Sequence, residues 1–345
     1  MEPKKRKLAI LAAIIDSYVE RGEPVGSKSL VEVLENSVSS ATIRNDMAAL
    51  AESGYLEQPH TSAGRIPSQR GYRMYVDRLM NCRTLPEELM KDIDLTLTGF
   101  SMDPEHFLKE SAHMLSEKTH LAAVASTPAS PDATISGVEI IATGQHTCLL
   151  MVILSSAALK TRICRTELDL TPENTQAVRV LMRQCLCGHR IAEINGRYIA
   201  QIKSQLGAHG QDIEPLLIAA REAARECASA QVMLGGQAYL LERGCFSDEA
   251  LRGILRFTSD RQKLASLMSG LHGATSVRIG SESGHPELSE ASVIVSRYCS
   301  SGGTTGWVGV IGPTRMNYSR VIPYIEYFST AVGRLMSAIE TDYIE

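Results

Sequence analysis

"SSATIRNDMAALAESGYLEQPHTSAGRIPS", residues 39–68, contains the start of a helix, an apolar helical stripe and two short extended segments around a polar turn. One of its first two serines can cap the helix, Ile43, Met47 and Leu50 recur on one helical face, and a glycine follows them. The segments "YLEQ" and "IPS" flank "PHTSAGR", a turn that carries Gly64 and Arg65. The stretch therefore predicts a helix followed by a two-stranded wing.

Two shorter patterns precede this stretch and predict two more helices. The first pattern has apolar residues at helical spacing and ends before Gly22, and its positions are Leu8, Leu11, Ala12, Ile15 and Val19. Ser27 can cap the second helix, whose apolar stripe is Leu30, Val31 and Leu34. Three helices joined by tight turns and followed by a wing predict a winged helix-turn-helix domain over residues 1–83.

The outer face of the third helix carries side chains that can recognise DNA bases. With about 100° per residue and Ile43 at the centre of the buried side, Arg44 and Asn45 point outward. The residues around them are Ala41, Thr42 and Ala48. Arginine can donate two hydrogen bonds to guanine, asparagine can pair with adenine, and methyl groups can contact thymine. The pattern favours base reading, and a solvated helix face remains the alternative.

Basic charge is concentrated in the first quarter of the chain. Residues 1–83 hold 12 lysines and arginines against 10 acidic residues, although the whole chain has a net charge of −4. "KKRK" at 4–7 either touches phosphates or solvates the terminus, and residues 60–83 contain five arginines against one acidic residue. Phosphate binding needs such a basic face. The residues expected to hold phosphate or enter a groove are Ser40, Arg65, Arg70 and Arg73.

A further helix is predicted directly after the wing, beginning at Pro67 or Ser68. Tyr72 and Tyr75 fall on one side of it. We interpret this tyrosine stripe as core packing rather than base stacking.

The sequence predicts neither a membrane span nor a catalytic site. The longest apolar run, from Cys148, is too short to cross a bilayer, and "MEPKKRK" lacks the apolar stretch of a signal peptide. We therefore expect a cytosolic protein, in which the eight irregularly spaced cysteines are reduced. No spacing typical of a serine hydrolase or a zinc peptidase occurs, and no cofactor is expected.

Three other motifs have structural interpretations. "GEPVGSKS" at 22–29 is similar to a phosphate loop, but a helix precedes it where a strand is required. "CLCGH" at 185–189 has the wrong spacing and too few ligands for zinc, so no metal is expected. "SSGGTTGWVG" at 300–309 lies between two apolar runs and predicts a hairpin turn.

The rest of the chain predicts an α+β fold, because strand patterns occur on both sides of a long helical stretch. A long helix around residues 321–339 closes the chain. The predicted parts are a helical linker at 84–118, an α+β domain at 119–170 and 229–345, and a mostly helical insertion at 171–228.

Segments near both ends of the chain resemble one family. "GEPVGSKSL" (22–30), the stretch at 39–68 and "GYRMYVD" (71–77) are similar to the amino-terminal region of the HrcA family of bacterial heat-inducible transcription repressors. "GVIGPTRMNYSRVI" (309–322) resembles that family's carboxy-terminal motif, so the resemblance spans the chain. Within this motif we expect a structural turn at Gly312, Pro313, Thr314, Arg315 and Met316.

The resemblance also implies a function. It implies that the α+β domain is GAF-like, that the insertion mediates homodimerisation, and that the dimer binds an inverted-repeat operator of chaperone operons. It further implies that the GroE chaperonin maintains the active repressor, so that heat lowers the amount of active protein. Two alternatives stay open: a regulator gated by a small molecule in the GAF-like domain, and an enzyme domain tethered to a DNA reader.

Overall fold

The computed structural model describes most of the chain. The described residues are 3–34, 38–59, 64–81, 84–100, 103–130, 132–156, 158–207, 210–242, 245–300 and 304–342. The chain divides into two compact units, each described below by itself. The first comprises Met1–Ser126, Val232–Tyr298 and Trp307–Leu335, and the second comprises Thr127–Gln231, Cys299–Gly306 and Met336–Glu345. The fold is mixed α and β, as the sequence predicted.

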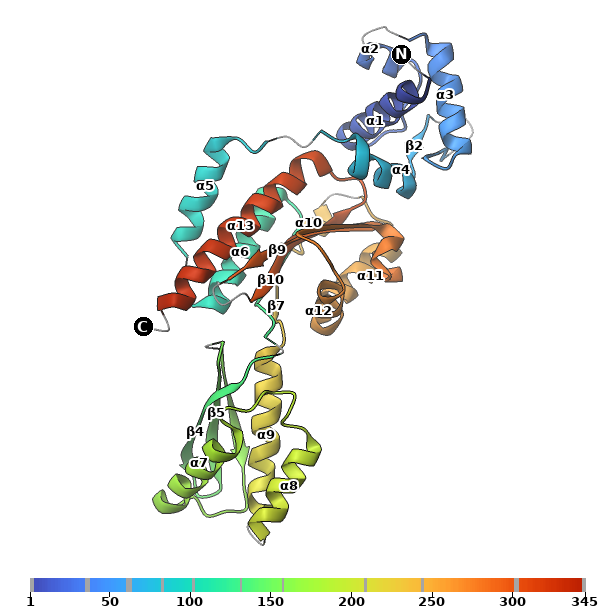
Figure 1. Cartoon of the computed structure of the whole chain (residues 1–345). Helices are drawn as coiled ribbons and strands as arrows, with labels where there is room; N and C mark the ends of the chain where they lie inside the picture. The colour runs from blue at the N-terminus through green and yellow to red at the C-terminus, as the bar shows by residue number, and fades with distance from the viewer. Residues whose placement is uncertain are drawn as a thin grey trace. The chain divides into compact units, whose positions relative to one another are not determined.

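Residues 3–81, here called the N-terminal body, contain the helices and strands predicted around the opening stretch (Figure 1). The elements are α1 (Pro3–Arg21), α2 (Ser29–Val33), α3 (Ser40–Glu52), β1 (Leu56–Glu57), β2 (Ile66–Pro67), α4 (Gln69–Met74) and the π-helical segment η1 (Tyr75–Leu79). Ile14 and Ile15 of α1, Leu30 of α2 and Ile43 of α3 are fully buried. The core of this body therefore contains Leu11 and Ile15 of the first predicted stripe, whereas Leu8, Ala12 and Val19 are only half-buried.

Serine side chains fix the start of α3 and α4. Ser39 Oγ accepts a hydrogen bond from the Thr42 amide at 3.2 Å, so Ser39 is the cap among the two serines predicted for α3. Ser68 Oγ accepts one from the Gly71 amide at 3.1 Å, so α4 begins directly after Ser68, one of its two predicted starts. The cap predicted at Ser27 is wrong. Lys28 precedes α2 without a side-chain cap, whereas Ser27 Oγ lies 3.1 Å from Ser40 Oγ.

β1 and β2 form an antiparallel ribbon after α3, with Leu56 opposite Pro67. Val25 and Arg65 exchange two backbone hydrogen bonds of 2.9 Å, which ties the ribbon to the turn between α1 and α2. Residues 60–63 of the predicted turn lie outside the described residues.

α4 is seated firmly on this ribbon. A Cβ atom at Gly71 would collide with the Tyr55 carbonyl oxygen, so glycine allows the close approach of the helix. Tyr72 and Tyr75 are buried, which confirms that they are core residues. The Tyr75 hydroxyl donates a hydrogen bond of 2.5 Å to Asp16 of α1.

Residues 84–126, 232–298 and 307–335, here called the central body, surround a mostly antiparallel sheet. In the described part of the chain the strand order of this central sheet is β7-β3-β10-β9-β8. The strands are β3 (Ala122–Ser126), β7 (Val232–Gly235), β8 (Thr275–Ile279), β9 (Ala291–Cys299) and β10 (Thr305–Pro313). Strands therefore lie on both sides of the long helical stretch, as predicted, but residues 305–309 of the predicted hairpin turn belong to β10.

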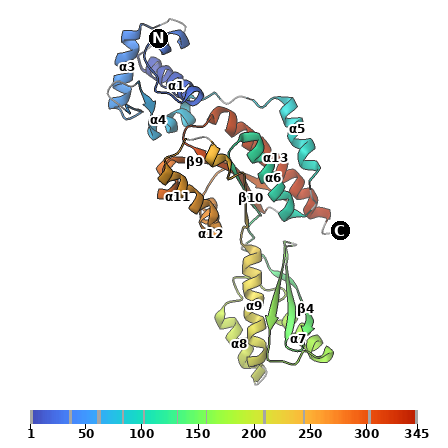
Figure 2. The ribbon, with the colours of Figure 1, turned by 180° about the vertical axis from the view of Figure 1, so that it is seen from behind.

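Helices cover both faces of the central sheet, α6 and α13 on one and α11 and α12 on the other (Figures 1 and 2). Phe257 and Leu264 form one buried apolar cluster with Val293 and Val295 of β9, so water is excluded from that face of the strand. The remaining elements are α5 (Glu87–Thr98), α6 (Pro104–Thr119), α10 (Tyr239–Glu242), α11 (Asp248–Ser259), α12 (Arg261–Ser269), η3 (Gly280–Ser283), η4 (Pro286–Leu288) and α13 (Tyr318–Asp342).

The prediction that residues 84–118 form a linker is wrong for α6. Leu108, Ala112 and Leu115 are fully buried, and α6 lies against β3 and β7. A Cβ atom at Gly235 of β7 would lie 2.8 Å from the Ala112 carbonyl oxygen, so a glycine permits this contact. α6 is thus a layer of the central body.

Residues 127–231, here called the insert, have a core of their own in the second unit. In the described residues their strands form a separate antiparallel sheet of order β4-β5-β6. The elements are β4 (Ile135–Gly144), β5 (Thr147–Leu154), β6 (Leu159–Arg165), α7 (Pro172–Leu186), α8 (Gly196–Leu206) and α9 (Gly210–Ala228). One face of this insert sheet packs on α7, α8 and α9.

The predicted domain boundaries are corrected accordingly. Residues 135–165 were assigned to the same domain as β3, but their strands pair with one another and share a core with the following helices. The insertion therefore begins near residue 127 rather than 171, and it is mixed rather than mostly helical. None of the described helices has the length and apolarity needed to cross a bilayer.

Candidate nucleic-acid interface

α3 presents the outer face that the sequence predicted. Ile43, Met47 and Leu50 are buried, whereas Ala41, Arg44, Asn45 and Ala48 are exposed. Neither the Arg44 nor the Asn45 side chain takes part in a hydrogen bond or ion pair within the described part of the chain. Both polar groups are therefore available to an external partner.

Ser40 and Thr42 lie at the first turn of α3 and are half-buried. Ser40 Oγ is 3.1 Å from Ser27 Oγ, and Thr42 Oγ1 is 2.9 Å from Ser39 Oγ. These hydroxyls hold the entry to the helix in place. Amides at such a helix start can attract phosphate.

An ion pair that the sequence analysis missed lies behind this face. Asp46 of α3 is buried, and its Oδ2 accepts a hydrogen bond of 2.6 Å from Arg6 Nε of α1. The hydrogen bond to Asp46 raises the pKa of Arg6. A carboxylate within the apolar stripe of α3 was the available signal, because a buried acid needs a partner. Arg6 is thus bound to Asp46 inside the N-terminal body, whereas phosphate contact was considered for the basic cluster at residues 4–7.

The arginines after α3 differ in how far they are engaged. Arg65 is paired through its backbone and its side chain is half-exposed. Arg70 is exposed, donates a hydrogen bond of 3.1 Å to the Ser53 carbonyl and lies 4.8 Å over the Tyr55 ring. Both guanidinium groups are at the end of the N-terminal body that carries the ribbon.

Arg73 is held by the central body. Its Nε donates to Glu282 at 3.0 Å, a second nitrogen donates to Glu282 and to the Val277 carbonyl, and a third donates to Asp77 at 3.1 Å. The hydrogen bond to Glu282 raises the pKa of Arg73. The predicted phosphate contact of Arg73 is therefore corrected, because four of its five N–H donors are already used within the chain.

The pKa of Glu282 is shifted in the opposite direction. Partial burial acts to raise its pKa, but hydrogen bonds from Arg73 and from the Ile279 amide outweigh burial, so the pKa of this carboxyl is lowered. Glu282 therefore remains charged opposite Arg73.

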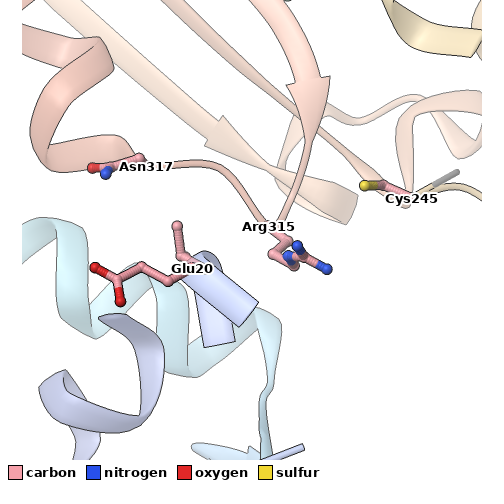
Figure 3. Close-up of a pocket in the computed structure, with 5 residues that line it drawn as sticks. Glu20, Cys245, Arg315 and Asn317 are labelled. Carbon is pink, nitrogen blue, oxygen red and sulfur yellow. The ribbon is translucent and has the colours of Figure 1, made fainter. Parts of the chain in front are cut away.

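Of the five residues expected to form a turn, Gly312 and Pro313 end β10, and the other three lie between β10 and α13. Met316 is buried, and the Thr314 amide donates to the Glu290 carbonyl at 3.1 Å, consistent with the expected structural turn. Arg315 does more than shape this turn, because its guanidinium lies 5.6 Å over the Tyr18 ring of α1. Figure 3 shows a pocket that is lined by Glu20 of α1, by Arg315 and by Asn317, which directly precedes α13.

The other motifs have local structural roles. Residues 22–29 connect α1 to α2, and their Val25 pairs with the ribbon. His189 Nε2 lies 3.1 Å from the Tyr198 hydroxyl, which donates to the Cys185 carbonyl at 2.6 Å. Across the residues that the structure describes, no group of three histidine, cysteine or acidic side chains is arranged to hold a metal ion.

Relatives of known class match almost the whole chain. A heat-inducible transcription repressor of Symbiobacterium thermophilum is 34% identical over 334 residues, covering 96% of this chain and 98% of the relative. One of Clostridium acetobutylicum is 35% identical over 331 residues, covering 94% and 95%. A crystal structure of a protein described as hypothetical has a TM-score of 0.60 at 25% identity and covers 97% of this chain and 98% of its own.

These matches define a transcription repressor and not an enzyme. The family model for the HrcA protein C-terminal domain matches residues 105–322. The chain belongs to the HrcA family of heat-inducible transcription repressors. Repression of transcription implies that DNA is a partner.

Proposed function

We propose that this chain represses heat-shock chaperone operons by inserting α3, as part of a winged helix-turn-helix, into the major groove of an operator. The exposed face of Arg44 and Asn45, free of intramolecular partners in the described residues, carries the proposal. Arg44 would donate to guanine, and Asn45 would pair with adenine. Ala41, Thr42 and Ala48 would shape the contact, because small side chains allow close approach to the base edges.

Contacts to the DNA backbone would come from the surroundings of α3. The ribbon would bring Arg65 to a phosphate or into the minor groove, and Arg70 would reach the backbone beside the end of α3. Ser40 and the amides of the first helical turn would face another phosphate. Arg73 has no place in this set, since Glu282 and Val277 occupy its donors.

The repressor would act as a homodimer on an inverted repeat. One reading helix contacts few base pairs, and a twofold dimer reads two half-sites separated by whole helical turns. The outward face of the insert sheet supports dimerisation through the insert. Ile141, Leu159 and Ile163 are 53%, 58% and 78% exposed, and they lie opposite the face that packs on α7, α8 and α9.

Cross-strand pairing makes this surface continuous. Leu149 of β5 is paired with Ile141 on one side and Ile163 on the other, and Ile153 is paired with Leu159. A contiguous apolar sheet face is unfavourable in water and is typical of an interface. A second copy of the same face would cover it.

Heat would act through the folding of the repressor. We propose that the central body is GAF-like and that the GroE chaperonin maintains the folded dimer, so that unfolded clients compete with the repressor during heat shock. A marginally stable fold makes such control effective, because a small change in free energy produces a large change in the active population.

A protection footprint on chaperone promoter DNA tests the proposal. We expect an inverted repeat to be protected at low temperature, lost on warming, and recovered to a greater extent with chaperonin and ATP. Protection of unrelated DNA to the same extent would contradict operator recognition, and equal recovery without chaperonin would contradict the GroE step. Thermal stabilisation by a small molecule that also shifts operator affinity would support a ligand-gated regulator instead.

A further inference from the structure

Within the first unit, the N-terminal body is joined to the central body by a set of specific side-chain contacts. On one side lie Tyr18 of α1 and three residues of α4, and on the other lie β8, η3 and the segment before α13. We call these contacts the junction, and the residues that define it are Tyr18, Gln69, Tyr72, Arg73, Glu282, Arg315 and Tyr318.

The polar half of the junction lies between α4 and η3. Gln69 Nε2 donates to the Ile279 carbonyl at 2.6 Å, while its Oε1 accepts from Ser281 Oγ at 2.9 Å. About one helical turn further along the same side of α4, Arg73 binds Glu282 and the Val277 carbonyl. Both side chains of α4 thus have donors or acceptors on two elements of the central body, which fixes direction as well as contact.

Gly280 makes this arrangement possible. Its φ of +54° lies in the left-handed region, and a Cβ atom there would lie 2.9 Å from Gln69 Oε1. A larger residue would therefore strain the backbone and push α4 away.

The second half of the junction joins Tyr18 of α1 and Tyr72 of α4 to residues 315–318, which lead into α13. Arg315 stacks over Tyr18, and a Cβ atom at Gly22 would collide with the Arg315 guanidinium. The rings of Tyr72 and Tyr318 have centroids 5.9 Å apart, and Ser292 of β9 holds the Tyr318 hydroxyl at 2.7 Å. The first half contacts β8 and η3 of the central body and the second contacts residues 315–318, so together they oppose rotation of the N-terminal body.

We propose that the junction fixes the direction in which α3 is presented by the central body, and that Glu282 and Arg315 are positioning residues for operator binding. They touch no base in the proposed complex and act through α4 and α1. The inference rests on the proposed function, in which a dimer reads an inverted repeat.

The physical reason is that the two reading helices of one dimer bind two half-sites on the same DNA molecule. When both reading helices are held in a fixed direction, the second half-site is met at a high effective concentration if its spacing matches. A loosened junction lowers that effective concentration at the matching spacing. It also permits half-sites at other spacings to be reached.

Operators of altered spacing test the proposal with the full-length protein. Kd values are measured for the protected inverted repeat, for the same repeat lengthened by roughly half a helical turn, about five base pairs, and for a single half-site. We expect wild type to prefer the natural spacing, and Glu282→Gln to lose roughly tenfold or more of that preference while its half-site Kd stays within about twofold. Glu287→Gln is the matched control, because Glu287 pairs with Lys263 inside the central body.

A second variant, Arg315→Gln, tests the same role independently in case Glu282→Gln does not fold. Arg315→Gln should show the same loss of spacing preference with an unchanged half-site Kd, and exchange of both charges in Arg73→Glu with Glu282→Arg should restore part of the preference.

The outcomes separate the junction from the proposed function. Retained spacing preference in Glu282→Gln and Arg315→Gln, or tighter operator binding by either, overturns the positioning role, and so does a weakened half-site Kd. If wild type fails to distinguish the half-site from unrelated DNA, the proposed base reading fails first and the positioning role falls with it.

Discussion

Arg6 of α1 and Asp46 of α3 form an ion pair on the buried side of the helix that carries Arg44 and Asn45. The Asp46 side chain is 7% exposed, whereas the Arg6 side chain is 24% exposed. The carboxylate is therefore far more dependent on its partner than the guanidinium is. The pair ties α3 to α1 and so fixes the rotation of α3 about its own axis.

Arg6→Met should lower the thermal unfolding temperature more than Asp46→Asn does. Arg6→Met leaves a buried carboxylate without a cation, while Asp46→Asn leaves an arginine that water can reach. The loss of stability in the double variant should be smaller than the sum of the losses in the two single variants, because the two residues interact directly. Calorimetry of all four proteins checks this order, and additive losses would show that the pair is uncoupled.

Arg65→Ala should weaken binding to all DNA sequences by a similar factor. A phosphate contact carries no base information, and its loss should reduce the slope of log Kd against log salt by about one. Titrations at several salt concentrations measure this slope. Glu57→Ala on β1 serves as a control for disturbance of the ribbon, and an unchanged slope in Arg65→Ala would remove the wing contact from the account.

Ile163→Glu should convert the repressor to a monomer. A charge at the most exposed apolar position of the insert sheet opposes its burial against a second copy, while the monomer fold is little affected. Sedimentation analysis gives the mass, and operator binding should fall with it. Val180→Glu on α7, an exposed apolar position away from this sheet, is the control. A dimeric Ile163→Glu protein would place the interface elsewhere.

Glu282 should contribute a pH-dependent part of the stability. Its pKa is lowered in the folded chain, so the unfolded chain binds more protons as the pH falls below the ordinary carboxyl range. The stabilisation by Glu282 is present above that range and is lost as the pH falls through the lowered pKa. Denaturant unfolding of wild type and Glu282→Gln from about pH 6 to about pH 3 should show a difference that shrinks on acidification. A constant difference would contradict the ion pair with Arg73.

Local signals in the sequence predicted the elements but not their partners. The apolar run of β5, the serine cap of α3 and the start of α4 depend on neighbouring residues, and the structure agrees with them. β5 pairs with its sequence neighbours β4 and β6, but a strand pattern does not show whether such a group forms its own sheet or joins β3, and the predicted domain was wrong. α11 was not predicted, although the Ser247 cap and the spacing of Ile254 and Phe257 were available signals.

The same distinction holds for the candidate interface. The outward direction of Arg44 and Asn45 followed from helical periodicity alone. Arg73 and Glu282 are 209 residues apart in sequence, and Arg6 and Asp46 are 40 apart. No periodic pattern links residues at such separations. The sequence therefore predicted that Arg73 binds phosphate, whereas in the structure it binds Glu282.

Binding of Arg44→Ala to a set of operators, each substituted at one base pair, tests the central claim most directly. Arg256→Ala, which removes an exposed arginine of α11, is the matched control. We predict that Arg44→Ala loses about 1–3 kcal/mol on the natural operator and no longer distinguishes the bases at one position of each half-site. Wild-type affinity and unchanged base preference at every position would contradict the account.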